Sequence, residues 1–257
     1  MSKFYIIPDI NRIEESIALA EKYDLGFEFN DFYMPNMLID ENLQNKTIEK
    51  YKSYDLPKDL TSHGAFFDVT VFSSDPEIEA VSKKRVIQSM EVASKIGAKS
   101  VIVHTNLMPF LKAEVYRTNF RKKSCDFYKE VCKEFPELNL YLENMFDDDP
   151  YELAKIGNEM MDVPNFGICF DYAHAFLSET PIDRWPVALQ GLIKHVHIND
   201  NDQVADLHQA LGDGIIDWKF FMDMQKKYFP DATVLIETSS IENQIKSLEY
   251  AKEIGLI

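Results

Sequence analysis

Six residues with metal-binding side chains close six consecutive apolar runs of this 257-residue chain. In chain order they are His63, His104, Glu143, Asp171, His197 and Glu237. Each run is typical of a short β-strand and is followed by a stretch with helical spacing. In a closed barrel of parallel strands the C-terminal strand ends meet on one rim, so these side chains would share one pocket. Imidazole and carboxylate groups together suit a divalent transition metal.

Each of these residues also has a purely structural interpretation when it is considered alone. Asp171 could cap the helix that follows it, and His63 or His104 could be a hydrogen-bonded interior histidine. Glu143 and Glu237 could belong to structural ion pairs, because an unpaired buried carboxylate is costly. The metal interpretation is favoured for the set as a whole, since the chain has only six histidines and three of them close strands.

Two further histidines and one aspartate extend the set of candidate metal ligands. His174 lies three residues after Asp171, and His208 follows Asp206 at D-x-H spacing. The pair Asp206 and His208 lies in residues 199–216, which hold too many acids and glycines for a strand or a helix. Long loops inside compact domains are often functional.

His195 is the remaining histidine, and it lies two residues before His197. Strand alternation places both imidazoles on one face, with His195 one layer deeper in the barrel. We expect His195 to be a hydrogen-bonding group behind the metal ligands or in the core.

The elements that must position these residues alternate between strand and helix along the chain. Strands are predicted near residues 3–7, 25–29, 59–63, 100–104, 138–142, 166–170, 193–198 and 233–237. The clearest helix is 76–96, with Pro76 in its first turn and Gly97 after its end, and others are expected at 112–135 and 241–254. Eightfold alternation predicts a parallel sheet with helices outside it.

We therefore predict an α/β fold, a (β/α)8 TIM barrel that occupies residues 1–257 as a single domain. The length is close to that of a typical barrel of this kind, and no Ser/Gly/Pro-rich linker divides the chain. An open doubly wound sheet is the alternative, but its ligands would gather at a switch point and not at six adjacent strand ends.

Composition restricts the classes of partner. The net charge is −16, from 27 basic and 43 acidic residues, and such a surface repels nucleic-acid backbones and anionic membranes. No window approaches the roughly 18 apolar residues of a membrane span, and the N-terminal residues lack a secretory pattern. Three cysteines without framework spacing indicate reduced thiols. We expect a cytoplasmic protein with a small-molecule substrate, and the sequence is compatible with a homo-oligomer.

Seven motifs together resemble the xylose-isomerase-like TIM barrels, over roughly residues 25–240. This superfamily includes sugar and sugar phosphate isomerases and epimerases, and the AP endonucleases of the endonuclease IV type. The motifs are SHGAFFD at 62–68, IGAKSVIVHTN at 96–106, YLEN at 141–144, FDYAHAF at 170–176, HVHINDND at 195–202, DLHQALGDGIID at 206–217 and IET at 236–238. Each is weakly specific alone, and their order makes the resemblance strong.

The resemblance implies a metal site whose composition depends on the branch of the superfamily. In the sugar epimerases one divalent ion is held by residues that match Glu143, Asp171, His197 and Glu237. In the AP endonucleases a three-zinc cluster has nine ligands. All nine have counterparts here: His63, His104, Glu143, Asp171, His174, His197, Asp206, His208 and Glu237. The expected cofactor is therefore one to three divalent ions, of zinc, manganese, cobalt or magnesium.

This sequence departs from both branches. Epimerases usually carry an arginine shortly after the HxH motif, and residues 199–203 contain none, which argues against recognition of a ketohexose in their manner. A DNA-binding enzyme should have basic loops around the rim. Arg12 is the only basic residue in the loops at 8–12, 30–40 and 64–77. A small substrate is favoured, and nucleic acid is not an expected partner.

The resulting hypothesis is a metal-dependent isomerase or epimerase of a sugar, sugar phosphate or related polyol. Proton transfer would occur next to a metal-bound carbonyl, with Glu143 and Glu237 as base and acid as well as ligands. His174 would hold a substrate hydroxyl or a second metal. The alternatives are a multinuclear zinc phosphodiesterase of the endonuclease IV type and a non-catalytic metal-binding barrel.

Three further residues are candidates for substrate binding. Phe66 and Phe67 follow the third strand and could wall the pocket, although aromatic residues there are equally often core. Glu28 ends the second strand and could bind a sugar, but a helix cap or an ion pair is an equally good interpretation.

Overall fold

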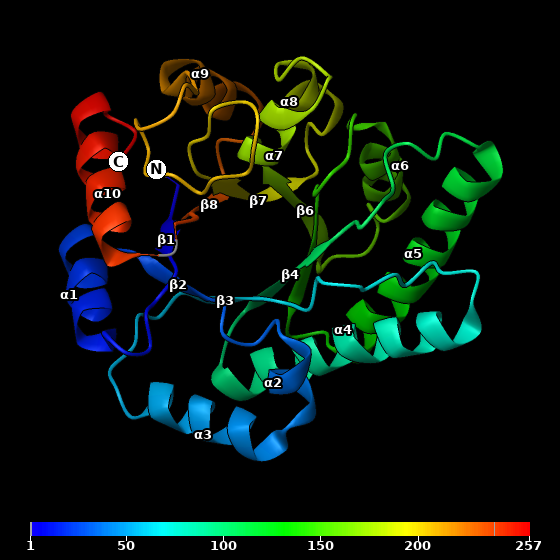
Figure 1. Cartoon of the computed structure of the whole chain (residues 1–257), viewed down its shortest axis with the longest axis horizontal. Coiled ribbons are helices and arrows are strands. Elements are labelled where there is room, and N and C mark those ends of the chain that lie inside the picture. Colours follow the sequence, from blue (N-terminus) through cyan, green and yellow to red (C-terminus); the bar gives the residue numbers. More distant parts are fainter. Residues whose placement is uncertain (1, 239) are drawn as a thin grey trace.

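The structure, a computed structural model, describes residues 2–238 and 240–257. Within these residues eight parallel strands close into a barrel, in which strands pair in chain order and β8 pairs with β1. The helices surround the strands (Figure 1). The chain is thus an α/β protein with the (β/α)8 TIM barrel fold, as the alternation of elements predicted, and the doubly wound alternative is excluded by the closure of the sheet.

The strands confirm the predicted positions, with boundaries that move by one residue at most. They are β1 (Phe4–Ile6), β2 (Gly26–Phe29), β3 (Leu60–His63), β4 (Ser100–His104), β5 (Asn139–Glu143), β6 (Phe166–Asp171), β7 (Ile193–Ile198) and β8 (Thr233–Ile236). The candidate ligands on strands lie at or near the C-terminal ends of those strands, and Glu237 directly follows β8.

The described helices are α1 (Ile13–Tyr23), α2 (Pro35–Ile39), α3 (Glu41–Lys52), α4 (Pro76–Ile96), α5 (Glu114–Glu134), α6 (Tyr151–Glu159), α7 (Tyr172–Leu177), α8 (Arg184–Ala188), α9 (Trp218–Tyr228) and α10 (Ile241–Ile254). Helix α4 illustrates how local sequence sets the boundaries. The Asp75 carboxylate accepts hydrogen bonds from the backbone N–H groups of Glu77 and Ile78, and Gly97 ends the helix with a φ of 88°.

Strand alternation divides the side chains between two environments. On β4, Val101 and Val103 belong to the apolar core between strands and helices. The alternate residues Ile102 and His104 are also buried, and therefore lie inside the barrel. The same alternation holds at β7, where Val196 joins the outer core and His195 and His197 point inward. Of the helices described, none combines the length and the apolar character that crossing a membrane requires.

The segment between β7 and α9 is a loop, as predicted, and it is organised by one buried carboxylate. Asp200 accepts hydrogen bonds from the N–H groups of Gly212 and Ile216 and from the indole of Trp218. A Cβ on Gly214 would lie 2.3 Å from the Asp200 carboxylate, so only glycine fits there. The loop is thereby folded back toward the barrel mouth.

Candidate metal centre

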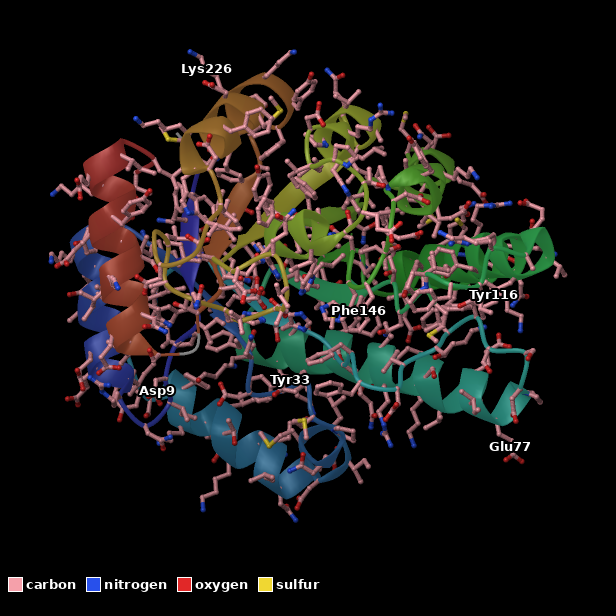
Figure 2. The ribbon with its side chains drawn as sticks, turned by 45° about the horizontal axis from the view of Figure 1, so that its top comes forward. Asp9, Tyr33, Glu77, Tyr116, Phe146 and Lys226 are labelled. Atoms are coloured by element: carbon pink, nitrogen blue, oxygen red, sulfur yellow. The ribbon has the colours of Figure 1, made fainter. Side chains whose placement is uncertain are left out.

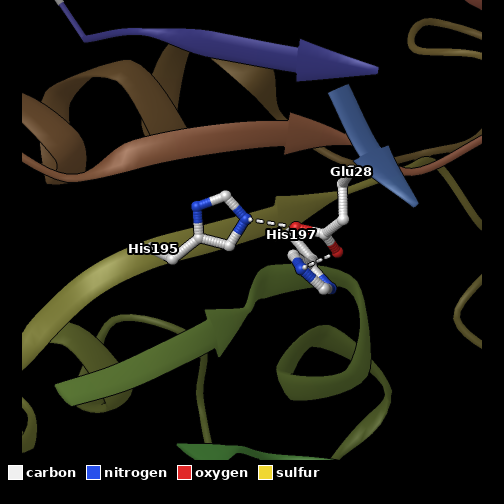
Figure 3. Close-up of side chains that lie close together, drawn as sticks. All are labelled: Glu28, His195 and His197. Atoms are coloured by element: carbon white, nitrogen blue, oxygen red, sulfur yellow. Dashed lines mark hydrogen bonds and ion pairs between the residues drawn. The ribbon is translucent and has the colours of Figure 1, made fainter. Parts of the chain in front are cut away.

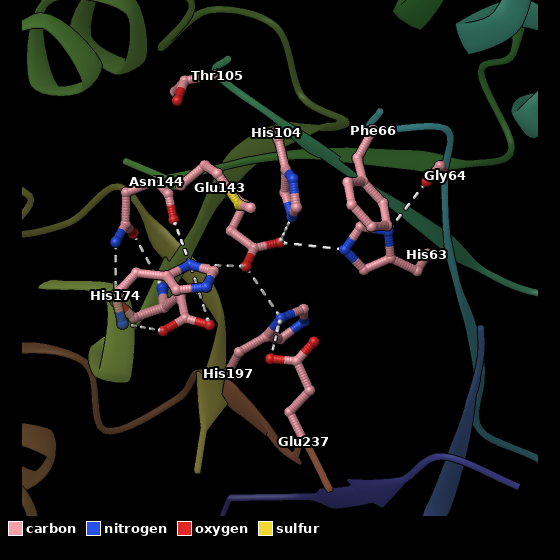
Figure 4. Close-up of polar contacts among 12 residues, drawn as sticks. His63, Gly64, Phe66, His104, Thr105, Glu143, Asn144, His174, His197 and Glu237 are labelled. Carbon is pink, nitrogen blue, oxygen red and sulfur yellow. Dashed lines mark hydrogen bonds and ion pairs between the residues drawn. The ribbon is translucent and has the colours of Figure 1, made fainter. Parts of the chain in front are cut away.

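The Glu143 carboxylate lies at the centre of the candidate metal ligands (Figure 4). Its Oε2 lies 3.5 Å from Nε2 of His63 and 3.3 Å from Nε2 of His104. Its Oε1 lies 3.2 Å from Nδ1 of His197 and 3.8 Å from Nδ1 of His174. All five side chains are buried. Residues from four strands and from α7 therefore meet at one point, as the predicted barrel required.

Glu237 and Asp171 complete this group. Oε2 of Glu237 lies 3.5 Å from Nδ1 of His197, the atom that also faces Glu143. Asp171 has two roles, because its Oδ1 accepts a hydrogen bond from the His174 backbone N–H and caps α7, while its Oδ2 lies 3.4 Å from the His174 ring. The capping interpretation and the ligand interpretation of Asp171 thus apply to different oxygens.

The long loop after β7 brings the D-x-H pair to the same place. Oδ2 of Asp206 lies 2.9 Å from Nε2 of His208 and 3.3 Å from Nε2 of His174. Nδ1 of His208 contacts the backbone oxygen of Glu237 at 3.0 Å. His208 has a φ of 47°, a conformation that a residue other than glycine rarely adopts. The structure thus gathers all nine candidate ligands.

The polar atoms of this cluster suit a shared cation. Within the described chain, several buried atoms have no hydrogen-bond partner: both carboxylate oxygens of Glu143, Oδ2 of Asp171, Nδ1 of His197, Oε2 of Glu237, Nδ1 of His104 and Oδ1 of Asp206. Buried acceptors without partners are costly. The sets whose ligand atoms lie within 4.8 Å of one another include His63, His104 and Glu143; His63, His197 and Glu237; and His174, Asp206 and His208. The donor types and their proximity fit a divalent metal.

Burial and the neighbouring charges shift the pKa values of the cluster in opposing directions. Burial, with the Glu237 and Glu143 carboxylates, raises the pKa of Asp171 to about 8 against the opposing effect of His174. Burial alone would also raise the pKa of Glu143, but the neighbouring imidazoles reverse this and hold it well below its usual range. Burial lowers the pKa of His208, and the carboxylates of Glu237 and Asp206 outweigh this and raise it to about 10. A bound divalent ion would compete with these protons.

Glu28, a candidate for substrate binding in the sequence, lies beside His195 and His197 inside the barrel (Figure 3). Its side chain is 0% exposed, and it does not line the cavity above the cluster. Its Oε2 lies 3.1 Å from Nε2 of His195 and accepts a hydrogen bond from the Thr61 hydroxyl, and its Oε1 lies 3.1 Å from Nε2 of His197. These contacts are those of the ion-pair interpretation of Glu28. A carboxylate beneath the candidate ligand His197 orients that ring.

His195 occupies the deeper layer that strand alternation predicted. Nδ1 of its ring lies 2.6 Å from the Thr233 hydroxyl, and Nε2 contacts Glu28. The ring also stacks on Tyr141, with 6.2 Å between ring centroids. His195 is therefore a hydrogen-bonding group behind the cluster, as expected.

A cavity of about 500 Å³ lies above the cluster and is walled in part by aromatic residues. The Phe66 ring lies 4.8 Å from the Tyr33 ring and 4.8 Å from the His104 ring, measured between centroids. Phe67 also lines the cavity and is more than half exposed. Both phenylalanines thus lie at the pocket wall and not in the core.

A model of the family described as "Xylose isomerase-like TIM barrel" matches residues 19–254. The chain belongs to this family. The resemblance carried by the seven motifs is therefore confirmed over almost the whole chain.

Relatives of this xylose isomerase-like barrel are known at the level of sequence and structure. The uncharacterized protein MJ1614 of Methanocaldococcus jannaschii is 28% identical over 245 residues, which are 94% of this chain and 90% of that protein. The solved structure of TTHB071 from Thermus thermophilus, soaked with ZnCl2, has a TM-score of 0.78 at 22% identity and covers 99% of this chain and 98% of its own. A D-tagatose 3-epimerase-like protein has a TM-score of 0.75 at 22% identity, with 98% and 96% coverage. At these identities the structural likeness bears on the fold alone.

One residue that contacts the candidate ligands of this family member was not singled out from the sequence. The Asn144 amide donates to the backbone oxygen of Asp171 at 2.8 Å and accepts from its backbone N–H at 2.9 Å. The backbone oxygen of Asn144 also contacts Nδ1 of His174 at 3.0 Å. Asn144 thus joins the ends of β5 and β6 and orients two candidate ligands. An amide directly after the strand-closing Glu143 is the signal that could have identified it.

Proposed function

We propose that this protein is a divalent-metal-dependent isomerase or epimerase of a sugar or related polyol. The observation that carries the proposal is the placement of Glu143 and Glu237 about one imidazole. Both carboxylates lie within 3.5 Å of Nδ1 of His197, one on β5 and the other directly after β8. Two buried carboxylates from different strands can serve as the base and the acid of a proton transfer.

The four residues Glu143, Asp171, His197 and Glu237 would hold the catalytic ion. That ion, when bound, supplies Lewis acidity that stabilises negative charge on a substrate oxygen as a neighbouring C–H bond loses its proton. The unpaired oxygens of Glu143 and Glu237 provide sites that can accept and return this proton. The burial of both side chains keeps bulk water away from the transfer.

His174 would position a hydroxyl of the substrate. Its Nδ1 is held by the backbone oxygen of Asn144, so the ring orientation is fixed. Its Nε2 lies on the side of Asp206, and His174 lines the cavity above the cluster. The ring can therefore hold a substrate oxygen at the edge of the metal centre, or a second ion shared with Asp206.

The charge of the cavity favours an uncharged substrate. Among its described lining residues there is no lysine or arginine, and acidic residues and histidines are prominent. A sugar phosphate would need a cation or a nest of backbone N–H groups at this rim. The structural neighbours include a D-tagatose 3-epimerase-like protein and a D-allulose 3-epimerase from Methylomonas sp., which supports chemistry on a sugar-like molecule. The free sugar or polyol is therefore preferred over its phosphate.

A zinc phosphodiesterase is the second candidate, and one observation favours it. The side chains of His63, His104, Asp206 and His208 gather with the four epimerase-type ligands and His174, so that more than one ion can be held. The net charge of −16 opposes binding of a polyanionic backbone. This candidate predicts cleavage of abasic-site DNA that is strongly inhibited by salt.

The test is solvent exchange. The protein loaded with Mn2+, Co2+, Mg2+ or Zn2+ is incubated in D2O with a panel of aldoses, ketoses and their phosphates, and deuterium uptake is measured by NMR. Glu143→Gln and Glu237→Gln should each abolish uptake, whereas Glu152→Gln, at a buried glutamate paired with Arg121 outside the site, should retain it. Uptake by none of the sugars, together with cleavage of abasic-site DNA, would replace the first candidate by the second.

A further inference from the structure

A second cavity, of about 370 Å³, adjoins the metal centre. It shares three lining residues with the cavity above the cluster, namely Met145, His174 and Asp206. A molecule bound at the metal centre can therefore extend into it without leaving the protein. An empty apolar space of roughly 150 Å³ is enough to hold benzene, so this cavity has room for a substituted ring.

Several apolar side chains line this second cavity, and two of them are exposed to solvent. Phe110 and Phe146 line it and are 88% and 63% exposed, and Met145 and Leu177 line it as well. Figure 2 labels Phe146 in the central part of that view and Glu77 at its edge. A single exposed apolar residue needs no explanation. Two aromatic residues that line a cavity continuous with a metal centre indicate a binding surface.

The charges around the second cavity are acidic or neutralised. Asp147, Asp148, Glu179 and Asp206 line it, and Lys112, the one basic residue among its described lining, is paired with Asp148. Arg117, which lies behind the loop, approaches Asp148 at 3.7 Å and donates to loop carbonyls. An anionic group is therefore disfavoured in this space.

We propose that the second cavity binds an uncharged apolar substituent of the substrate, such as an aryl or short alkyl group. This inference rests on the proposed function and narrows it, because the substrate class becomes a keto-glycoside, or an ether of a sugar, that retains a carbonyl next to the exchanging C–H. A free hexose would leave Phe110 and Phe146 exposed, and a sugar phosphate would meet carboxylates. Met145 and His174 mark the junction at which the polar and apolar parts of the substrate would meet.

The test uses a pair of metal chelators with the same head and different tails. Acetohydroxamic acid and benzohydroxamic acid are titrated by calorimetry into the zinc-loaded protein. We expect benzohydroxamic acid to bind at least tenfold more tightly, since even one methylene in an apolar pocket contributes about tenfold. Phe146→Ser and Phe110→Ser should each reduce this preference to about threefold or less. Met161→Ser, at a methionine that is 66% exposed and lines neither cavity, should leave it unchanged.

An equal preference in the wild type and both phenylalanine variants would overturn the proposal. A shift from dimer to monomer in Phe110→Ser or Phe146→Ser, seen by light scattering, would also overturn it, because the surface would then be an interface between copies. The two proposals fail separately. Deuterium uptake by free sugars without any tail preference removes only the apolar subsite. A tail preference without uptake by any free sugar or aryl keto-glycoside removes only the isomerase function.

Discussion

Oε1 of Glu28 lies 3.1 Å from Nε2 of His197, on the side of the ring opposite to the nitrogen that faces Glu143 and Glu237. The carboxylate stabilises a proton on Nε2, which leaves the lone pair of Nδ1 available to a cation. Burial would raise the pKa of Glu28, but His197 and His195 outweigh it and lower that pKa, so the carboxylate is charged. The contact with Glu28 thus determines which ring nitrogen of His197 is free to face a cation.

Glu28→Gln should therefore weaken metal binding without removing a ligand. We expect a loss of about ten- to a hundredfold in zinc or manganese affinity, the usual effect of losing such an outer partner. Competition titration against a chromophoric chelator measures it. Glu152→Gln, at another buried glutamate, is the matched control. An affinity equal to that of the wild type would show that Glu28 does not act through His197.

Asn144→Ala should lower both stability and metal affinity. The substitution leaves the backbone N–H and oxygen of Asp171 unpaired in a buried place, which should reduce the free energy of unfolding by about 2–4 kcal/mol. Asn165 provides the control, because its amide donates to three backbone carbonyls in the segment 132–138, away from the metal centre. Urea unfolding should show similar losses for both alanine variants. Only Asn144→Ala should bind metal more weakly.

Asp147→Asn should change how stability depends on pH. Burial raises the pKa of Asp147 to about 6, against the opposing hydrogen bond from Thr105. A raised pKa in the folded state means that the contribution of Asp147 to stability is fully present below about pH 4 and is lost as the pH rises through 6. The free energy of unfolding of the wild type should fall relative to that of the variant by about 2–3 kcal/mol between pH 4 and 7.

An asparagine at position 147 can make the hydrogen bonds that Asp147 makes. Oδ2 of Asp147 accepts from the Thr105 hydroxyl and the Met145 N–H, and Oδ1 has no partner among the described residues. The side-chain oxygen of an asparagine can take the place of Oδ2 and keep both hydrogen bonds, and its nitrogen can take the place of Oδ1. Urea titrations in a chelator at each pH measure the effect, with the exposed Asp24→Asn as control. Parallel pH profiles for Asp147→Asn and the wild type would contradict the prediction.

Asp206→Asn should lower the number of zinc ions per chain. Asp206 bridges His174 and His208 through one oxygen, and its other oxygen is buried without a partner among the residues described. With excess zinc we expect more than one ion in the wild type and one fewer in the variant, counted by native mass spectrometry. Asp202→Asn, at an exposed position of the same loop, should keep the wild-type count. A single ion in the wild type would show that this group is not a separate site.

The sequence was sufficient to predict the barrel and the convergence of the six candidate ligands, because each apolar run ends at its candidate ligand. Strand alternation also predicted the layer of His195. The depth of Glu28 could not be read in this way, since it depends on the register in which Glu28 lies beside Thr61 and beneath His197. The stagger between neighbouring strands decides which inward-facing residue lies nearest the C-terminal rim of the barrel. The sequence of a single strand does not show this stagger.

The sequence indicated that Asp206 and His208 of the loop after β7 could join the cluster, but it did not show where they would lie. Asp206 and His208 reach the cluster because Asp200 collects N–H groups from several parts of the loop, and because Gly214 allows the close approach. These contacts have no periodic signature. The cavity walled by Phe110 likewise depends on how the loops after β4 and β5 lie over the barrel, which no local pattern specifies.

Most of the candidate ligands come from strands that are far apart in the chain, and this has a consequence for how the protein matures. His63, on β3, lies with His197 and Glu237 only when the sheet has curled into the barrel that the pairing of β8 with β1 closes. A nascent or partly folded chain has no place at which these donors meet, so it cannot capture the ion. Acquisition of metal would then act as a check on completed folding, and a chain that retains its ion is one whose barrel has closed.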